Sequence, residues 1–343
     1  MWKTILTGNQ GKLKHAPPRY NGNMTELQKW LSAGPLITDG AWGTQLLALG
    51  LAPGALPDAW NLERPDRVES VARAYVEAGS QVILTNTFRS NRITLEEAGL
   101  AGQVTAINRA GVEISKRAAA GKALVFASIG PTGKLLMNGE VGRGEVAAAF
   151  AEQAVALAAA GADALLIETM SDIEEAGLAL SAAKSTGLPV IVSFAFDSGK
   201  KKDRTMMGVT PEAAARAMES AGADGVGANC GAGIERFVPV CERLGAACSL
   251  PIWIKANAGL PEVQEGSVVY STPAGVFASY LPALVEAGAA FIGGCCGTNP
   301  EFIRALAGSA VGRTPWSARV PQDPLCREAD EGVGRGPGGP PHS

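Results

Sequence analysis

The chain has 343 residues, 46% of them hydrophobic, and its 30 basic and 33 acidic residues leave a formal net charge of −3 at pH 7. This composition excludes a disordered or fibrous chain, and the balanced charge is untypical of a protein that grips nucleic acid or an anionic membrane surface. We therefore expect neither a nucleic-acid partner nor a membrane partner.

The opening segment, residues 1–25, is predicted to be an N-terminal extension. Its first twenty residues are basic, but they contain neither the apolar core of about 7–15 residues nor the small-residue cleavage site of a secretory signal. No run in the chain approaches the roughly 20 consecutive apolar residues that cross a bilayer. Because its six cysteines are too few for a disulfide scaffold, the chain is predicted to lie in the reducing cytoplasm.

Residues 26–312 repeat one pattern, in which a short apolar run is followed by an amphipathic stretch rich in Ala, Glu and Arg. Each repeat is typical of a β-strand followed by an α-helix. The eight apolar runs are 36–39, 81–88, 123–131, 164–170, 189–196, 225–230, 251–259 and 291–297. Strands that are apolar on both faces are typically parallel, and eight of them close into a single-domain (β/α)8 TIM barrel. An open doubly wound α/β sheet is the alternative, which is disfavoured because no Gly-x-Gly-x-x-Gly follows the first run.

Helices are predicted between the strands, for example over 143–160, 172–186, 211–221 and 273–287. Thr210 before Pro211 and Thr272 before Pro273 have the pattern of an N-cap followed by a first turn. Glycine is predicted to end four helices in the left-handed conformation, at Gly79, Gly161, Gly222 and Gly288. Residues 313–343 are rich in Pro and Gly without apolar periodicity, which predicts a disordered C-terminal tail.

Three cysteines stand at the ends of predicted strands. Cys230 closes the sixth run in Gly-Ala-Asn-Cys-Gly, and Cys295 and Cys296 close the eighth in Gly-Gly-Cys-Cys-Gly. The carboxyl ends of all barrel strands meet at one rim, where active sites form. Adjacent residues on a strand point to opposite faces, so the cysteine pair can reach one ion only if the backbone leaves strand geometry there. The flanking glycines permit that departure.

Three sulfur ligands with an open fourth position suit a catalytic Zn²⁺ ion, which is tetrahedral and borderline-soft. The sequence therefore predicts a zinc site. Inert core packing and a strained vicinal disulfide are the alternatives. The other three cysteines are assigned no role: Cys241 and Cys248 fall on or just after the helix that follows the sixth strand, where packing is the better interpretation, and Cys326 lies in the tail.

Two carboxylates, Asp39 and Glu168, directly follow apolar runs. A carboxylate at the mouth of a barrel can hold a substrate ammonium group or act as an acid or base. A solvated strand end is the alternative for each. The turn over residues 39–44 also offers backbone N–H groups that could bind a carboxylate at a helix start.

Together these residues resemble the homocysteine S-methyltransferase family, which includes the homocysteine-binding module of cobalamin-dependent methionine synthase and betaine–homocysteine methyltransferase. The resemblance covers about residues 35–306. It is carried by Asp-Gly-Ala-Trp-Gly-Thr at 39–44, Thr-Asn-Thr-Phe at 85–88, Glu-Thr at 168–169, and the two cysteine phrases, the second of which continues as Thr-Asn-Pro. The two cysteine phrases are highly specific in combination.

The resemblance implies a zinc-binding (β/α)8 barrel in which the homocysteine sulfur takes the fourth ligand position. It implies zinc ligands at Cys230, Cys295 and Cys296, an ammonium site at Asp39 and Glu168, and pocket walls at Asn86, Thr87 and Asn257. A thiol with a pKa of about 8.5 is a poor nucleophile at neutral pH, and zinc makes it a thiolate. The implied activity is methyl transfer to homocysteine, which forms methionine.

The methyl donor stays open. The phrases at 39–44 and 297–298 look more like the methionine synthase module than the betaine enzyme. A methyl-corrinoid would have to arrive on a separate protein, because the chain after the barrel is too short for folate-binding and cobalamin-binding domains. Betaine, S-methylmethionine or another sulfonium or quaternary amine are the competing donors.

Two other functions also stay open. A phosphate-binding barrel lyase or isomerase would cradle phosphate at Gly293 and Gly294, and its activity would not respond to chelators. The second of these functions is that of a non-catalytic, zinc-stabilised partner subunit in a methyl-transfer complex. Structural zinc normally has four protein ligands, whereas this sequence offers three. The pattern predicts no particular oligomeric state.

Overall fold

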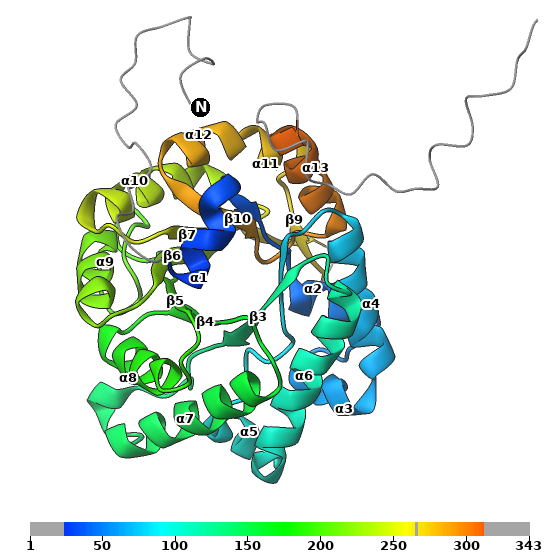
Figure 1. Cartoon of the computed structure of the whole chain (residues 1–343), viewed down its shortest axis with the longest axis vertical. Helices are drawn as coiled ribbons and strands as arrows, with labels where there is room; N and C mark the ends of the chain where they lie inside the picture. The colour runs from blue at the N-terminus through cyan, green and yellow to red at the C-terminus, as the bar shows by residue number, and fades with distance from the viewer. Residues whose placement is uncertain (1–23, 265–266, 312–343) are drawn as a thin grey trace, which may run out of the picture.

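The computed structural model describes residues 24–264 and 267–311, which form a ring of parallel strands surrounded by helices (Figure 1). The strands of the ring are β1 (Leu36–Ile37), β2 (Val82–Leu84), β3 (Leu124–Ile129), β4 (Ala164–Met170), β5 (Val190–Phe194), β6 (Gly225–Gly233), β7 (Ile252–Asn257) and β10 (Ala289–Gly294). Their order is β1-β10-β7-β6-β5-β4-β3-β2. A parallel bridge between Thr38 and Val82 joins β1 to β2, the two ends of this order, and closes the ring. The predicted (β/α)8 TIM barrel is confirmed, and the open-sheet alternative is wrong.

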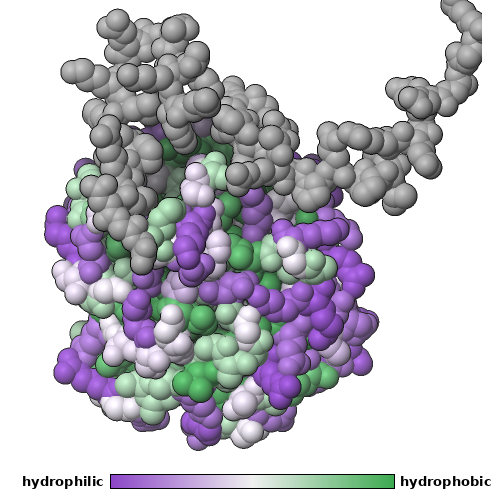
Figure 2. Space-filling view, viewed as in Figure 1, coloured by the Kyte–Doolittle hydropathy of each residue, from purple (hydrophilic) through white to green (hydrophobic). Residues whose placement is uncertain are grey.

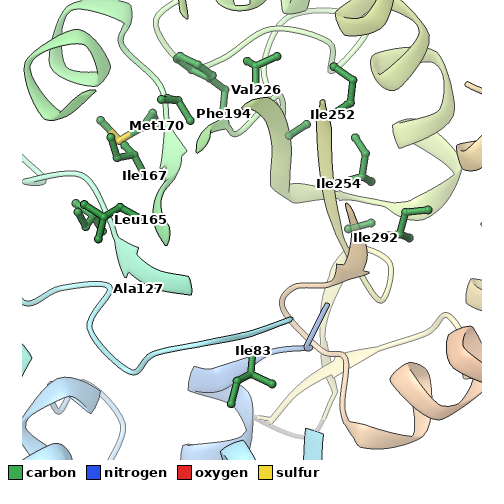
Figure 3. Close-up of a cluster of buried hydrophobic side chains, with 14 of the residues drawn as sticks. Ile83, Ala127, Leu165, Ile167, Met170, Phe194, Val226, Ile252, Ile254 and Ile292 are labelled. Atoms are coloured by element: carbon green, nitrogen blue, oxygen red, sulfur yellow. The ribbon is translucent and has the colours of Figure 1, made fainter. Parts of the chain in front are cut away.

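The outer faces of the strands pack against the surrounding helices. Figure 3 shows outward-facing side chains of this layer, including Ile83, Leu165, Phe194 and Ile254, which are all fully buried. Strands covered on both faces expose no side chain to water, which explains why the runs in the sequence are almost continuously apolar. Figure 2 shows hydrophilic and hydrophobic residues interspersed over the outside of the helices. These are α2 (Trp42–Ala48), α3 (Trp60–Glu63), α4 (Pro65–Glu77), α5 (Arg92–Glu97), α6 (Val104–Ala119), α7 (Arg143–Ala159), α8 (Ile173–Lys184), α9 (Pro211–Ser220), α10 (Phe237–Ala247), α11 (Ala274–Ser279), α12 (Leu281–Glu286) and α13 (Pro300–Val311).

The inside of the barrel has its own apolar core. The rings of Phe126, Trp253 and Phe291 meet with centroids 5.2–6.0 Å apart. Helix α1 (Glu26–Trp30) lies across the barrel end that faces the viewer in Figure 1, where Leu27 is buried and the Trp30 ring lies 5.5 Å from Phe126. Among the described residues, α1 and this aromatic cluster fill the amino-terminal end of the barrel.

The helix ends follow the sequence signals with one exception. The Thr210 side chain accepts a hydrogen bond from the backbone of Ala213, so this predicted N-cap is confirmed. Gly79, Gly161, Gly222 and Gly288 all have positive φ, as predicted for helix ends.

The single helix predicted over 273–287 is wrong, because the segment forms two helices, α11 and α12, that meet at Tyr280. Pro282 has no N–H to continue the hydrogen-bond ladder of α11. Thr272 is not an N-cap either, since Pro273 takes that position without a side-chain hydrogen bond. The Thr272 N–H instead donates to the Ala258 carbonyl at 3.0 Å, which ties the segment back to the end of β7.

A two-stranded antiparallel hairpin, β8 (Pro261–Gln264) with β9 (Ser267–Tyr270), follows β7 and was not predicted. It returns the chain to the carboxyl rim, where the half-buried Tyr270 packs against the backbone of Gly297. The hairpin thus contributes to the wall around the cysteine-bearing loop.

The predicted N-terminal extension lies outside the described residues except for its last two positions, and so do the tail over 313–343 and Cys326. In the part of the chain that the structure describes, no helix has the length and hydropathy to span a membrane. Both extensions remain sequence-based predictions.

Asp58 is a buried carboxylate whose replacement by asparagine is expected to stabilise the fold. Burial raises its pKa to about 6, against the ordinary 3.8, although its Oδ1 accepts hydrogen bonds from Arg89 N–H and Ser90 Oγ. Because the folded-state pKa is raised, the ionised group costs stability above pH 6 and the cost disappears below the unfolded value. An asparagine oxygen can accept both bonds without charge.

Asp58→Asn should therefore raise the free energy of unfolding at pH 8 by at most about 3 kcal/mol, with a smaller gain at pH 5. Urea unfolding at the two pH values measures this difference. A variant that is less stable than the wild type at pH 8 would contradict the assignment.

Candidate metal and substrate site

Three cysteine sulfurs meet at the carboxyl rim of the barrel. Cys230 lies within β6, whereas β10 ends at Gly294, so Cys295 and Cys296 lie just beyond their strand. The three Sγ atoms are all within 4.8 Å of one another, and those of Cys230 and Cys296 are 3.8 Å apart. All three thiols are free, so the vicinal disulfide is not formed. The chain leaves strand geometry at the cysteine pair, as the argument from residue alternation required.

The backbone around the sulfurs is held in unusual conformations. Cys230 has a φ of 62°, in the left-handed region that β-strand residues avoid. Gly297, just after the pair, has a φ of 80°, and a Cβ atom there would lie 2.2 Å from the Tyr270 ring. Only glycine satisfies both conditions. The Thr298 hydroxyl donates to the Cys295 carbonyl at 2.7 Å and accepts from Ala41 N–H at 3.1 Å, which fastens the loop to the start of α2.

The three thiols shift one another's pKa values. Hydrogen bonds from Cys295 and Cys296 lower the pKa of the Cys230 thiol far below its ordinary value. The same interaction raises the pKa of Cys296 to about 12. A second and third thiolate at this distance therefore require a cation, because like charges in a buried site disfavour one another.

The residues present fit a metal ion that prefers thiolate ligands. In addition to the three sulfurs, the Asn257 side chain lies beside Cys230, where its hydrogen bond favours the thiolate. Its amide oxygen, Oδ1, is buried and has no hydrogen-bond partner. A buried acceptor without a partner is costly.

Asp39 is fully buried, and both of its carboxylate oxygens have internal donors. Oδ2 accepts from Trp42 Nε1 and from Leu84 N–H, each at 2.7 Å. Oδ1 forms an ion pair with the ammonium of Lys255. The carboxylate therefore ties β1 to α2, β2 and β7.

Glu168, by contrast, keeps acceptor capacity. Its Oε1 accepts from the Ser128 hydroxyl at 2.5 Å, whereas its Oε2 accepts only a long hydrogen bond from the described residues, from Asn229 Nδ2 at 3.4 Å. The side chain is 7% exposed. Burial raises its pKa, while the nearby Lys255 ammonium and the Ser128 hydroxyl act in the opposite direction.

Asn86 and Thr87 lie together at the loop after β2. The Asn86 amide donates to the Pro57 carbonyl at 2.8 Å and to Asn61 Oδ1 at 3.0 Å. The Thr87 hydroxyl donates to the Ser128 carbonyl at 2.7 Å. Both side chains are buried, and these bonds fix the loop beside the residue that contacts Glu168.

Two functional candidates went unassigned in the sequence. Lys255 is buried in the middle of β7, and its signal was a single charge inside the apolar run Ile-Trp-Ile-Lys-Ala. Asn229 precedes Cys230 in the sixth run, and its Oδ1 accepts from Thr169 N–H at 2.9 Å and from Ser193 Oγ at 2.7 Å. Thr169 has a φ of 62°, so Asn229 stabilises the left-handed turn that follows Glu168.

Cys241 and Cys248 lie away from this cluster. Cys241 is buried within α10, where its thiol faces the Ala287 carbonyl, and Cys248 caps the end of the same helix. Their predicted packing role is confirmed.

Comparison with known proteins gives a consistent picture. Residues 36–310 match the family model described as homocysteine S-methyltransferase. The methionine synthase of Mycobacterium tuberculosis is 31% identical over 306 residues, which cover 84% of this chain and 25% of that protein. The methionine synthase of Mycobacterium leprae is 30% identical over 311 residues, with the same coverage. The chain thus spans about a quarter of the length of these curated relatives.

Among solved structures, the metallated form of the homocysteine methyltransferase MmuM from Escherichia coli is similar along its whole length. It is 25% identical, with a TM-score of 0.69, over 82% of this chain and 99% of that protein. The family model covers the barrel from β1 to α13, including every residue of the cysteine cluster. The chain therefore belongs to the homocysteine S-methyltransferase family.

Proposed function

We propose that the chain is a zinc-dependent homocysteine S-methyltransferase whose homocysteine-binding barrel spans residues 26–312. The observation that carries the proposal is the convergence of three cysteine sulfurs at the open end of the barrel, although Cys230 and Cys296 are 66 residues apart. The free thiols are also consistent with the predicted cytoplasmic location.

Zinc suits this set of donors. In a tetrahedral site with Zn–S bonds of about 2.3 Å, two sulfurs lie about 3.8 Å apart, and Cys230 Sγ and Cys296 Sγ have that separation. Cys230, Cys295 and Cys296 would hold the ion and leave one position for a substrate. When bound, zinc lowers the pKa of a fourth thiol, so that the homocysteine sulfur is a thiolate at neutral pH.

The surrounding residues would bind and orient the amino acid. Glu168, with free acceptor capacity at the rim, is assigned to the substrate ammonium group. Asp39, which is occupied by internal donors, supports the pocket through its contacts to Trp42 and Lys255. Asn257 would line the sulfur end, and Asn86 and Thr87 would form the wall at the loop after β2.

The reaction transfers one methyl group. The homocysteine thiol loses its proton to solvent, and its sulfur attacks the methyl carbon of the donor in line with the leaving group. A sulfur–carbon bond forms as the donor–methyl bond breaks, and the electron pair leaves with the donor. The product is methionine. Because α1 and the inner aromatic core fill the opposite end of the barrel, the donor must approach from the carboxyl rim.

The proposal is tested by incubating the purified protein with L-homocysteine and a panel of donors: a methylated corrinoid, S-methylmethionine and betaine. Methionine measured by mass spectrometry is expected with one of them. Activity should disappear after chelation and return with zinc, and L-cysteine, one methylene shorter, should be a poor acceptor. Failure of every donor together with no detectable homocysteine binding would refute the proposed function.

The lyase or isomerase alternative gains no support from the structure. A Cβ at Gly293 would lie 1.9 Å from Thr38 Oγ1, and one at Gly294 would lie 2.3 Å from Thr298 Oγ1. The two glycines therefore allow close packing between the end of β10 and its own neighbours. A non-catalytic partner subunit would bind zinc but would leave homocysteine unmethylated with every donor.

A further inference from the structure

The backbone of the two neighbouring cysteines is anchored at three points. Cys295 N–H donates to the Ala256 carbonyl at 2.7 Å, and the Cys296 carbonyl accepts from Ala258 N–H at 3.0 Å, so both outer ends are tied to the end of β7. The middle point is the Cys295 carbonyl, which belongs to the peptide group that joins the two cysteines. It accepts from the Thr298 N–H at 3.1 Å and from the Thr298 hydroxyl at 2.7 Å.

The orientation of this peptide group decides where both sulfurs lie. Side chains of adjacent residues point to opposite sides of an extended backbone, so Cys295 and Cys296 can face one ion only while the peptide between them is turned. The two bonds from Thr298 hold the peptide in its turned orientation. One of them comes from a side chain, so a substitution can remove it and leave the backbone bonds in place.

The Thr298 hydroxyl is itself held by the start of α2. It accepts from Ala41 N–H at 3.1 Å, and the Ala41 carbonyl accepts from the Tyr75 hydroxyl at 2.7 Å. Thr298 and Tyr75 are both 0% exposed. A Cβ atom at Gly40 would lie 2.8 Å from each of the two hydroxyl oxygens, so the packing leaves them little space to shift. A chain of three hydrogen bonds therefore runs from Tyr75, on α4, through Ala41 to the peptide between the cysteines.

We propose that Thr298 and Tyr75 are positioning residues of the metal centre. Their hydroxyls, linked through Ala41, hold the peptide between the two cysteines so that both sulfurs face one ion before it binds. This inference rests on the proposed function, because it concerns the zinc site of the same barrel. Neither hydroxyl is a ligand in this assignment. Their effect is on the affinity for the metal, since a site that is already arranged requires little ordering when the ion binds.

Thr298→Val keeps the size of the side chain and removes the hydroxyl. The variant leaves Ala41 N–H buried without its acceptor and the Cys295 carbonyl with one donor instead of two, so the peptide between the cysteines is held less firmly. Loss of a group that orients a metal ligand lowers metal affinity about tenfold to a hundredfold, and the Kd for zinc should rise by that factor. Thr298→Ser restores the hydroxyl and should bind zinc as the wild type does. Tyr75→Phe, one bond further from the cysteines, should raise the Kd by a smaller factor.

The measurement is competition for zinc between the purified full-length protein and a chromophoric chelator of known affinity. With Co²⁺ in place of zinc, the visible ligand-field absorption reports whether the ion is tetrahedral, and its intensity should fall in Thr298→Val and recover in Thr298→Ser. Thr205→Val is the matched control, because the buried Thr205 hydroxyl also donates to a carbonyl, that of Ser171 at 2.6 Å, and accepts from an N–H, that of Val209 at 3.1 Å. This control should lose thermal stability but keep the wild-type affinity for zinc.

An unchanged affinity for zinc in Thr298→Val or in Tyr75→Phe overturns the proposal. A loss in Thr298→Ser as large as that in Thr298→Val also overturns it, and so does an equal loss in Thr205→Val, which would indicate general instability. Should Thr298→Val fail to fold, Tyr75→Phe decides by the same criterion. A wild type that binds no zinc refutes the proposed function together with this inference, whereas unchanged affinity in variants of a zinc-binding wild type refutes only the assignment of the two hydroxyls.

Discussion

Replacement of Cys296 by alanine is expected to abolish both stoichiometric metal binding and methyl transfer. The sulfur of Cys296 lies 3.8 Å from that of Cys230, and its removal leaves only two thiols, Cys230 and Cys295, at the site. Two thiolates cannot hold a tetrahedral zinc ion against solvent and keep a single position open for substrate. Metal content by elemental analysis and methionine formation with homocysteine as acceptor measure the two losses together.

Cys248→Ser is the matched control. Cys248 is a half-buried free thiol at the end of α10, outside the cluster of three sulfurs, so this variant should keep full metal content and full activity. If Cys296→Ala retained wild-type activity without metal, the three-sulfur site would have no role in catalysis. Metal lost equally from both variants would instead indicate general instability.

Glu168→Gln is expected to raise the KM for homocysteine by about tenfold to a hundredfold with a smaller effect on kcat, because a charge-assisted hydrogen bond is worth about 1.5–3 kcal/mol. Glutamine preserves the size of the side chain and an oxygen that can accept from Ser128 Oγ. It removes the negative charge that pairs with the substrate ammonium group. Initial rates over a range of homocysteine concentrations at saturating methyl donor separate KM from kcat.

Glu175→Gln offers a comparison at a similar carboxylate. Glu175 is also buried, its pKa is also raised by burial, and it accepts hydrogen bonds from Thr132 N–H and the Thr132 hydroxyl. It lies in α8 and is not part of the sulfur cluster. Its variant should leave the KM unchanged. Equal KM values for wild type and Glu168→Gln would remove Glu168 from substrate binding.

Much of the architecture could be read from the sequence because it depends on local periodicity. Each barrel strand is buried on both faces, so a continuous apolar run marks it, and every one of the eight runs overlaps one strand. Glycine at a helix end has a local conformational cause, and all four predicted positions have positive φ. The sequence did not predict the division of 273–287 into two helices, because Tyr280 and Pro282 do not interrupt the apolar pattern.

The candidate site, too, could be predicted from the sequence only in part. By itself, the sequence determined the barrel and the rim to which Cys230, Cys295 and Cys296 belong, since the carboxyl ends of parallel strands must meet. Only the tertiary structure decided which carboxylate is free. Asp39 and Glu168 follow apolar runs in the same manner, yet Asp39 is neutralised by Lys255, 216 residues away, and Glu168 is not. A charge pair is set by distances across the barrel, and no local pattern along the chain records them.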